Sequence, residues 1–261
     1  MSGSAEAVAT SAPVLSRPRW PAPLRTVATT AHRGFRVVVV ARRRLVRRRI
    51  LVALWWRAVW VRSQVDCDVA ADVKWGRRLR FTVEPRTHSA IRVAPGCKIG
   101  DDVRIVLQGG TLVLGQAVDV RARCVFGVGG RLEFGGRNVV SYGSTFHCDD
   151  AITVGYMASL AEYCTLADVS HTHDGPHEFH GDNVTTSPID VGENAWLGAK
   201  VTVARGVHIG SRSIIGANSV VVKDVPAGHL ASGVPAQVVR PVGAGRARAV
   251  PPTTTARANV P

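Results

Sequence analysis

Four histidines lie within one short segment of the chain, and histidine is the side chain best suited to proton transfer near neutral pH. His171, His173, His177 and His180 all fall in the stretch HTHDGPHEFHGDNVTTSP. Histidine, with a pKa of about 6.5, serves as a general base, and its ring nitrogens are also common zinc ligands. The segment therefore allows proton abstraction from a hydroxyl or, with His147 as a further ligand, a metal site.

The residues on both sides of this segment follow a repeat of six. Every sixth residue from Val191 to Val221 is aliphatic, and a small or β-branched residue follows each one four positions later. The same phase occurs at 93–105 and 154–166, and it is weak between 109 and 150, where we expect irregular coils. This period fits neither a helix nor a simple strand. It predicts an all-β fold, a left-handed parallel β-helix with aliphatic side chains inside a triangular coil and small residues at its corners.

The repeat divides the chain into segments of different character. We expect a disordered basic leader at 1–34, a basic, Trp-rich amphipathic helix at 35–64, the β-helix domain at 65–240 and a disordered tail at 241–261. The segment 171–188 interrupts the hexads, and we interpret it as a loop inserted on one face of the domain. Such loops commonly carry function, so the histidines of this loop are candidates for proton abstraction or metal binding.

The positive charge is concentrated near the N-terminus. The net charge is +14, and residues 1–80 contain 17 Lys/Arg against 4 Asp/Glu, whereas 81–261 contain 16 against 15. A nearly neutral body argues against a nucleic-acid partner, which would require a basic stripe on the folded domain. Six arginines between 42 and 49, followed by tryptophans, favour peripheral contact of residues 35–62 with an anionic membrane. Packing on the body or a partner, and RNA binding, are the alternatives.

The cysteines and the N-terminus indicate the compartment. The five cysteines, at 67, 97, 124, 148 and 164, include no C-x-x-C pair, and the N-terminus lacks the pattern of a signal peptide. We expect reduced thiols, with those of Cys97, Cys124 and Cys164 in strand-like runs as small core residues. The predicted location is cytoplasmic, with the basic arm able to hold the protein at the inner face of the cell membrane. No uncharged apolar run approaches the roughly 20 residues of a bilayer-spanning helix.

Three further motifs make the sequence similar to a known family. Asn-x-Trp-x-Gly occupies 194–198, Lys-Asp-Val-Pro occupies 223–226 and Gly-x-Pro-Ala occupies 233–236. Together with the hexads, they resemble the hexapeptide-repeat acyltransferases, in the maltose/galactoside O-acetyltransferase-like branch, over roughly residues 90–240. The resemblance implies an enzyme that transfers acetyl from acetyl-CoA to a hydroxyl of a sugar, glycan or glycolipid. It also implies a homotrimer with active sites between subunits, and no required metal.

The resemblance assigns roles to individual residues. His171 matches the general base, with His173 as its competitor for that role, and the amide of Ala199 matches the donor that stabilises the oxyanion. The other implied contacts are the nucleotide at Lys223 and Arg240, the pantetheine at Trp196 and Ala217, and the acceptor hydroxyls at Asp150. The hexad phase independently predicts that Trp196 points out of the prism, toward a ligand or a neighbouring subunit.

Other functions stay open from the sequence alone. An N-acetyltransferase of an amino sugar is the nearest, because nothing in the sequence separates oxygen from nitrogen acceptors. A γ-class carbonic anhydrase shares the prism and uses three histidines on zinc, although the ligand spacing here fits that family poorly. A non-catalytic membrane-associated scaffold is the third alternative. The N-terminal helical region of the sugar enzymes is absent, which shifts the expected acceptor from a simple sugar to a glycan or lipid-linked acceptor.

Overall fold

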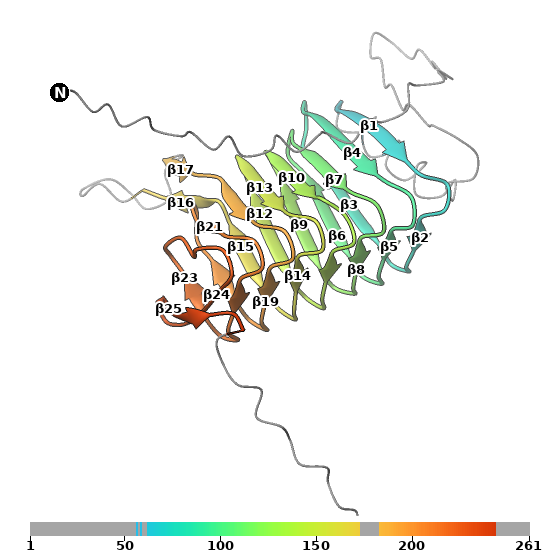
Figure 1. The fold of residues 1–261 in the computed structure, drawn as a ribbon. Helices are drawn as coiled ribbons and strands as arrows, with labels where there is room; N and C mark the ends of the chain where they lie inside the picture. The colour runs from blue at the N-terminus through green and yellow to red at the C-terminus, as the bar shows by residue number, and fades with distance from the viewer. Residues whose placement is uncertain (1–55, 57, 59–61, 173–182, 244–261) are drawn as a thin grey trace, which may run out of the picture.

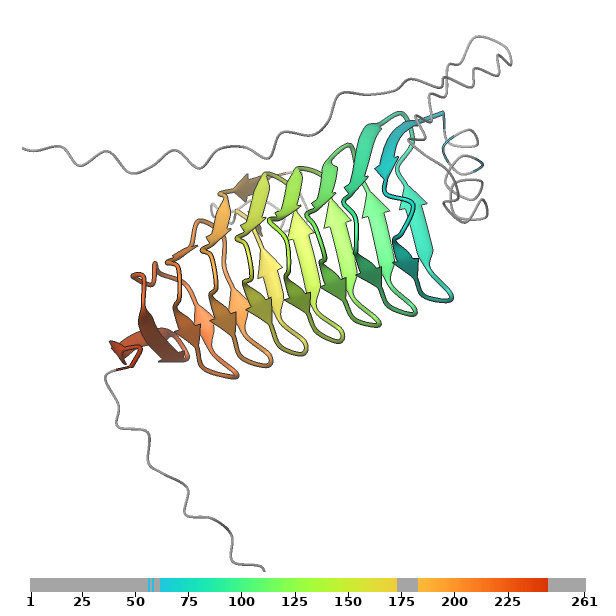
Figure 2. The same ribbon diagram turned by 45° about the vertical axis from the view of Figure 1, so that its right-hand side comes forward.

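The protein is a three-sided prism of stacked coils. The structure, a computed structural model, describes residues 56, 58, 62–172 and 183–243. The chain visits three sheets in turn, parallel throughout apart from one antiparallel pair at the C-terminal end, so that successive coils add strands to each sheet (Figures 1 and 2). The predicted all-β, left-handed parallel β-helix is confirmed. We call the sheets face 1, face 2 and face 3 in the order in which the chain reaches them.

The strands are short and follow one another in the same order in each coil. Face 1 contains β1 (Gln64–Val69), β4 (His88–Val93), β7 (Thr111–Leu114), β10 (Arg131–Phe134), β13 (Ala151–Val154), β18 (Ile189–Val191) and β21 (His208–Ile209). Face 2 contains β2 (Lys74–Trp75), β5 (Lys98–Ile99), β8 (Asp119–Val120), β11 (Val139–Val140), β14 (Ser159–Leu160), β19 (Trp196–Leu197), β22 (Ile214–Ile215), β24 (His229–Gly233) and β25 (Ala236–Pro241). Face 3 contains β3 (Arg80–Val83), β6 (Arg104–Leu107), β9 (Val125–Val128), β12 (Thr145–Cys148), β15 (Thr165–Ala167), β20 (Thr202–Val203) and β23 (Val220–Val221). Outside the prism, β16 (Val169–His171) pairs antiparallel with β17 (Val184–Thr186).

The coils become shorter along the chain, and this explains why the hexads are visible only in part. Paired positions are 24 residues apart between β3 and β6, 21 between β6 and β9, and 20 in each of the next two pairs. The spacing falls to 18 residues between β20 and β23, and of the spacings named here only this one equals three hexads. The prediction of irregular coils at 109–150 is therefore wrong. These coils are regular, but their strands on faces 1 and 3 have four residues, so the repeat is no longer six.

The wider coils have a larger interior, and phenylalanine fills it. Phe126 and Phe146 are in register on neighbouring face 3 strands, and their rings stack with centroids 5.2 Å apart. Phe134 meets both rings edge-on, at 6.1 and 5.3 Å. All three side chains are fully buried. In the shorter coils after Ile189 the buried hydrophobic side chains are only Val, Ile, Leu and Ala, because close packing in a smaller cross-section requires smaller side chains.

Glycine is required where the wide coils turn from face 3 to face 1. A Cβ on Gly110 would overlap the carbonyl oxygen of Gly130, and a Cβ on Gly130 would overlap that of Asp150. Any larger residue at these positions would push successive coils apart. The third member of this column, Asp149-Asp150, ends the glycine series at the point where the next coil leaves the prism.

The cysteines are buried, and several belong to the corners. All five are free. Cys97, Cys124 and Cys164 precede strands rather than lying within them, and each thiol donates to a carbonyl oxygen of the next coil, on Gly115, Ser141 and Gly198, at 3.0, 3.1 and 3.2 Å. The expected role as small buried residues is confirmed, whereas the expected position in strand-like runs is corrected to the corner before each strand.

The buried thiols predict a loss of stability at alkaline pH. Burial raises the pKa of Cys67 and of Cys148 to about 12, and that of Cys124 and of Cys164 to about 11, from 9.0. In the unfolded chain these thiols ionise near pH 9, while in the folded protein they stay protonated, so the free energy of unfolding should fall as pH rises above about 9. Urea unfolding at pH 7.5 and 10.5 measures the loss. A double Cys67→Ala, Cys148→Ala variant should lose less than the parent, and an equal loss would contradict the assignment.

The N-terminal arm lies mainly outside the described residues. Trp56 and Ala58 are helical, and Ala58 is buried in the core of the first coil, where its carbonyl accepts the Ser63 amide at 2.9 Å. β1 begins at Gln64. Among the residues that the structure describes, no helix is long and apolar enough to cross a membrane. The predicted leader, the arginine cluster at 42–49 and the tail from residue 244 onward lie outside the described ranges.

Candidate active site

The predicted histidine loop leaves the prism at the corner between face 3 and face 1, as a hairpin. β16 and β17 form its base, and His171 is paired with Val184 across the two strands. The Thr172 amide donates to the carbonyl of Asn183 at 2.9 Å. The sequence predicted an inserted loop that begins at His171. Instead, β15 ends at Ala167 and His171 closes a second strand, because Asp168 turns the chain out of the sheet. The His171 side chain is exposed.

Asp168 anchors this hairpin to the prism. Its side chain is fully buried, and its two carboxylate oxygens accept the amides of Asp149 and Asp150 at 2.8 and 3.0 Å. In the preceding coil, the equivalent amides of Gly129 and Gly130 both donate to the carbonyl of Cys148. The carboxylate therefore replaces the acceptor that the departing chain cannot supply. Its main chain also binds the far end of the insertion, since the Asp168 carbonyl accepts the Ser187 amide at 2.9 Å.

A line of polar side chains leads along the same corner toward the hairpin. The Gln108 side-chain amide donates to the Glu84 carboxylate at 2.9 Å, one coil apart. Further along, burial raises the pKa of Asp149, with smaller increases from the charges of Asp168 and Glu84, while His147 opposes them. Sequence patterns do not reveal this line, because its members are spaced by the coil length, 24 residues from Glu84 to Gln108 and about 20 per coil thereafter. That length follows from the stacking register and not from a constant repeat.

Four of the five residues predicted to meet the acyl donor lie on a different part of the prism; the exception is Lys223. Trp196 is 51% exposed on face 2, in register with Ser159 and Ile214, so its predicted outward direction is confirmed. Ala199 and Ala217 occupy the corner between faces 2 and 3 in successive coils. Within the described part of the chain, neither of their amides has a hydrogen-bond partner, so both can donate to a ligand.

The predicted site residues therefore form two groups, separated by face 3. Asp150, His171 and Lys223 lie at the corner between faces 3 and 1, and all three are exposed. The second group lies on face 2 and at its corner with face 3: Trp196, Ala199, Ala217 and Arg240, the last on β25 with its guanidinium bound to the Pro241 carbonyl at 3.2 Å. The outward side chains of face 3 between them are uncharged from β9 onward, apart from His147. His173 lies outside the described residues.

Metal ligation has no support in the described part of the site. The described residues contain no group of three or more His, Cys, Asp or Glu side chains that could hold a metal ion. His173, His177 and His180 lie outside those residues, so this finding concerns the prism and the base of the hairpin.

Comparisons with known proteins identify the repeat. Residues 188–223 match the family described as bacterial transferase hexapeptide (six repeats). Galactoside O-acetyltransferase of Escherichia coli strain K12 is 32% identical over 130 residues, which cover 49% of this chain and 63% of the relative. A protein of Schizosaccharomyces pombe strain 972 named as an acetyltransferase is 33% identical over 130 residues, covering 49% and 61%. A solved galactoside acetyltransferase in complex with coenzyme A is 27% identical, covers 50% of this chain and 64% of that one, and gives a TM-score of 0.36.

The C-terminal coils thus carry the bacterial transferase hexapeptide repeat. The resemblance to hexapeptide-repeat acyltransferases, in the maltose/galactoside O-acetyltransferase-like branch, is confirmed by these matches. The chain spans less than two thirds of the length of the two curated relatives named above.

Proposed function

We propose that this protein is an acetyl-CoA-dependent O-acetyltransferase that acts on a hydroxyl of a sugar or glycan. The observation that carries the proposal is the position of His171, an exposed histidine on a hairpin that a buried carboxylate anchors to the prism. The similarity to galactoside O-acetyltransferase supports the same reaction class. A base held on a rigid element is what attack by a weakly nucleophilic hydroxyl requires.

In the proposed reaction, His171 takes the proton of the acceptor hydroxyl while the hydroxyl oxygen attacks the thioester carbonyl of acetyl-CoA. The carbonyl oxygen becomes an oxyanion, and the Ala199 amide donates a hydrogen bond to it. The C–S bond then breaks, and the imidazolium returns its proton to the departing CoA thiolate. The acceptor gains an acetyl ester, CoA leaves as a thiol, and no oxidant or reductant is needed.

The two groups of site residues imply that one chain does not make a complete site. Face 3 separates His171 from Ala199 and Trp196. We therefore propose that the second group of residues of one copy, on face 2 and at its corner with face 3, meets the hairpin of a neighbouring copy in a homotrimer. The uncharged outward side chains of face 3 support this arrangement, since burying them between copies leaves few unpaired charges. They are Val125, Thr145, Thr165, Thr202 and Val220.

Calorimetric titration with acetyl-CoA tests the proposal directly. We expect micromolar-range affinity, because Lys223 and Arg240 offer charge pairing to the CoA phosphates. Lys223→Ala should weaken binding by roughly tenfold. The matched control is Lys98→Ala, which removes an exposed lysine from face 2 at the N-terminal end of the prism. It should bind acetyl-CoA like the parent. Absence of acetyl-CoA binding, or equal affinity in both variants, would contradict the donor assignment.

A further inference from the structure

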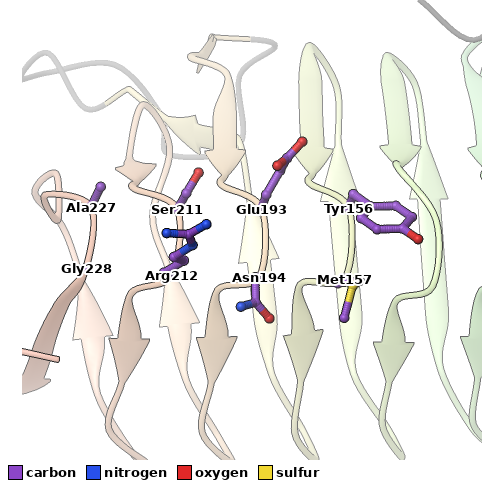
Figure 3. A pocket seen from close by; sticks show the side chains of 8 residues that line it. All are labelled: Tyr156, Met157, Glu193, Asn194, Ser211, Arg212, Ala227 and Gly228. Atoms are coloured by element: carbon purple, nitrogen blue, oxygen red, sulfur yellow. The ribbon is translucent and has the colours of Figure 1, made fainter. Parts of the chain in front are cut away.

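A hollow of about 540 Å³ lies at the third corner of the prism, between faces 1 and 2. Face 1 separates it from the corner that carries His171, so it is not part of the proposed catalytic site. Side chains from successive coils line it, side by side along the corner (Figure 3). The lining residues are Tyr156 and Met157, Glu193 and Asn194, Ser211 and Arg212, and Ala227 and Gly228.

The backbone under this hollow is rigid. The Asn194 amide donates to the Tyr156 carbonyl at 2.9 Å, the Arg212 amide to Glu193 at 2.8 Å, and the Gly228 amide to Ser211 at 2.9 Å. Each coil is thus bonded to the next at the lining residues themselves. A ligand that binds here meets a lining whose backbone is already held in place, which reduces the entropy lost on binding.

The charges in the hollow are balanced but not paired with each other. Glu193 and Arg212 lie on adjacent coils, yet among the described residues neither makes an ion pair. Elsewhere in the same fold, adjacent coils do pair such charges, as Arg78 does with Asp102 at 2.6 Å. A carboxylate, a guanidinium, an amide and a hydroxyl therefore remain available, with donors and acceptors in one place and a net charge near zero.

One end of the hollow is lined by an aromatic and a thioether side chain. Tyr156 and Met157 are each 43% exposed. The Tyr156 ring lies against Gly136, where an added Cβ would be 3.5 Å from a ring carbon. The ring thus lies along the neighbouring coil, and with Met157 it supplies the apolar end of the hollow, beside the polar groups of the later coils (Figure 3).

We infer that this hollow is a carbohydrate-binding subsite for a neutral sugar unit, separate from the catalytic site. The apolar face of a pyranose fits the Tyr156 ring, and vicinal hydroxyls match the planar groups of Arg212, Glu193 and Asn194. A phosphate or carboxylate ligand gains no net attraction here, because the charge of Glu193 offsets that of Arg212. The inference rests on the proposed function and deepens it: the acceptor is a glycan of several sugars that the enzyme holds at a second point.

The test measures oligosaccharide binding to the full chain without acetyl-CoA. The probes are neutral oligosaccharides of glucose, galactose and N-acetylglucosamine, with oligosaccharides of galacturonic acid for comparison, detected by saturation-transfer NMR and titration. We expect a neutral probe to bind, with affinity reduced about tenfold or more in Tyr156→Ala and in Arg212→Ala. Tyr156→Phe, which keeps the ring, should retain most of the affinity.

Matched controls separate this site from general effects. Arg137→Ala changes an exposed arginine that lies on the same corner but does not line the hollow. Its backbone is left-handed, with a φ of 52°, as is that of Arg212, with a φ of 59°. Tyr142→Ala removes an exposed tyrosine from another corner. Both should bind like the parent, and thermal unfolding should show that all variants are folded.

The outcomes distinguish this inference from the proposed function. Failure of every neutral probe to bind, binding of the acidic probe alone, or unchanged affinity in Tyr156→Ala and Arg212→Ala would overturn the subsite. If acetyl-CoA still binds in that case, the proposed function stands without the subsite. If a neutral probe binds as expected but acetyl-CoA does not, the subsite stands and the transferase proposal fails.

Discussion

Replacement of His171 by alanine is expected to reduce acetyl transfer by about 10²–10⁴-fold, the usual contribution of a positioned general base. The variant should fold normally, because the side chain is exposed on the hairpin and fills no space in the core. Its affinity for acetyl-CoA should also be unchanged, since His171 is proposed to take the proton of the acceptor hydroxyl and not to bind the donor. The measurement is the initial rate of CoA release with a sugar or glycan acceptor, together with calorimetry of acetyl-CoA binding.

Two further histidine variants make this result interpretable. His208→Ala removes an exposed histidine of face 1, where it pairs with Asp190 at 3.0 Å, and it should transfer acetyl at the parental rate. His173→Ala tests the competing base within the same segment. If His173→Ala loses activity while His171→Ala keeps it, the base is His173. If neither variant loses activity, both assignments of the base are rejected.

Replacement of Asp168 by alanine is expected to be the most destabilising single change at the site, at about 2–4 kcal/mol. The substitution leaves the amides of Asp149 and Asp150 without the acceptor that now binds both. These part-buried donors would lose their acceptor, and hydrogen bonds to a carboxylate are stronger than neutral ones. Asp168→Asn, which keeps one acceptor oxygen, should lose less. Urea unfolding at neutral pH measures both variants.

Asp168→Ala should also reduce catalysis, because it displaces the hairpin that carries His171 and not because Asp168 takes part in the reaction. Once the corner relaxes, the hairpin base moves, so kcat should fall while acetyl-CoA affinity is retained. Hydrogen exchange should speed up at the Asp149 and Asp150 amides before it changes in the core strands. Asp150→Ala, which alters only an exposed side chain at that corner, should change the free energy of unfolding by no more than about 0.5 kcal/mol. Parental stability in Asp168→Ala would show that the carboxylate is not the anchor.

The sequence alone determined the fold and part of the site, because both depend on local patterns. An inward aliphatic residue in every hexad is a property of a few neighbouring residues, so the series from Val191 to Val221 indicated the prism. The same phase predicted that Trp196 points outward, and its 51% exposure agrees. The histidine segment was recognised because it interrupts a regular repeat. None of these inferences required knowledge of which coil lies on which.

Only the tertiary structure decided what lies together across coils. The coil length changes from 24 to 18 residues, so a residue's neighbours on the next coil cannot be counted from a constant repeat. This register brings Asp168 under the amides of Asp149 and Asp150, aligns Glu84 with Gln108, and places Glu193 beside Arg212 in the third corner. It also assigns His171 and Ala199 to opposite sides of face 3. Contacts between coils depend on stacking register, and stacking register is set by the packing of the wide and narrow coils rather than by any single hexad.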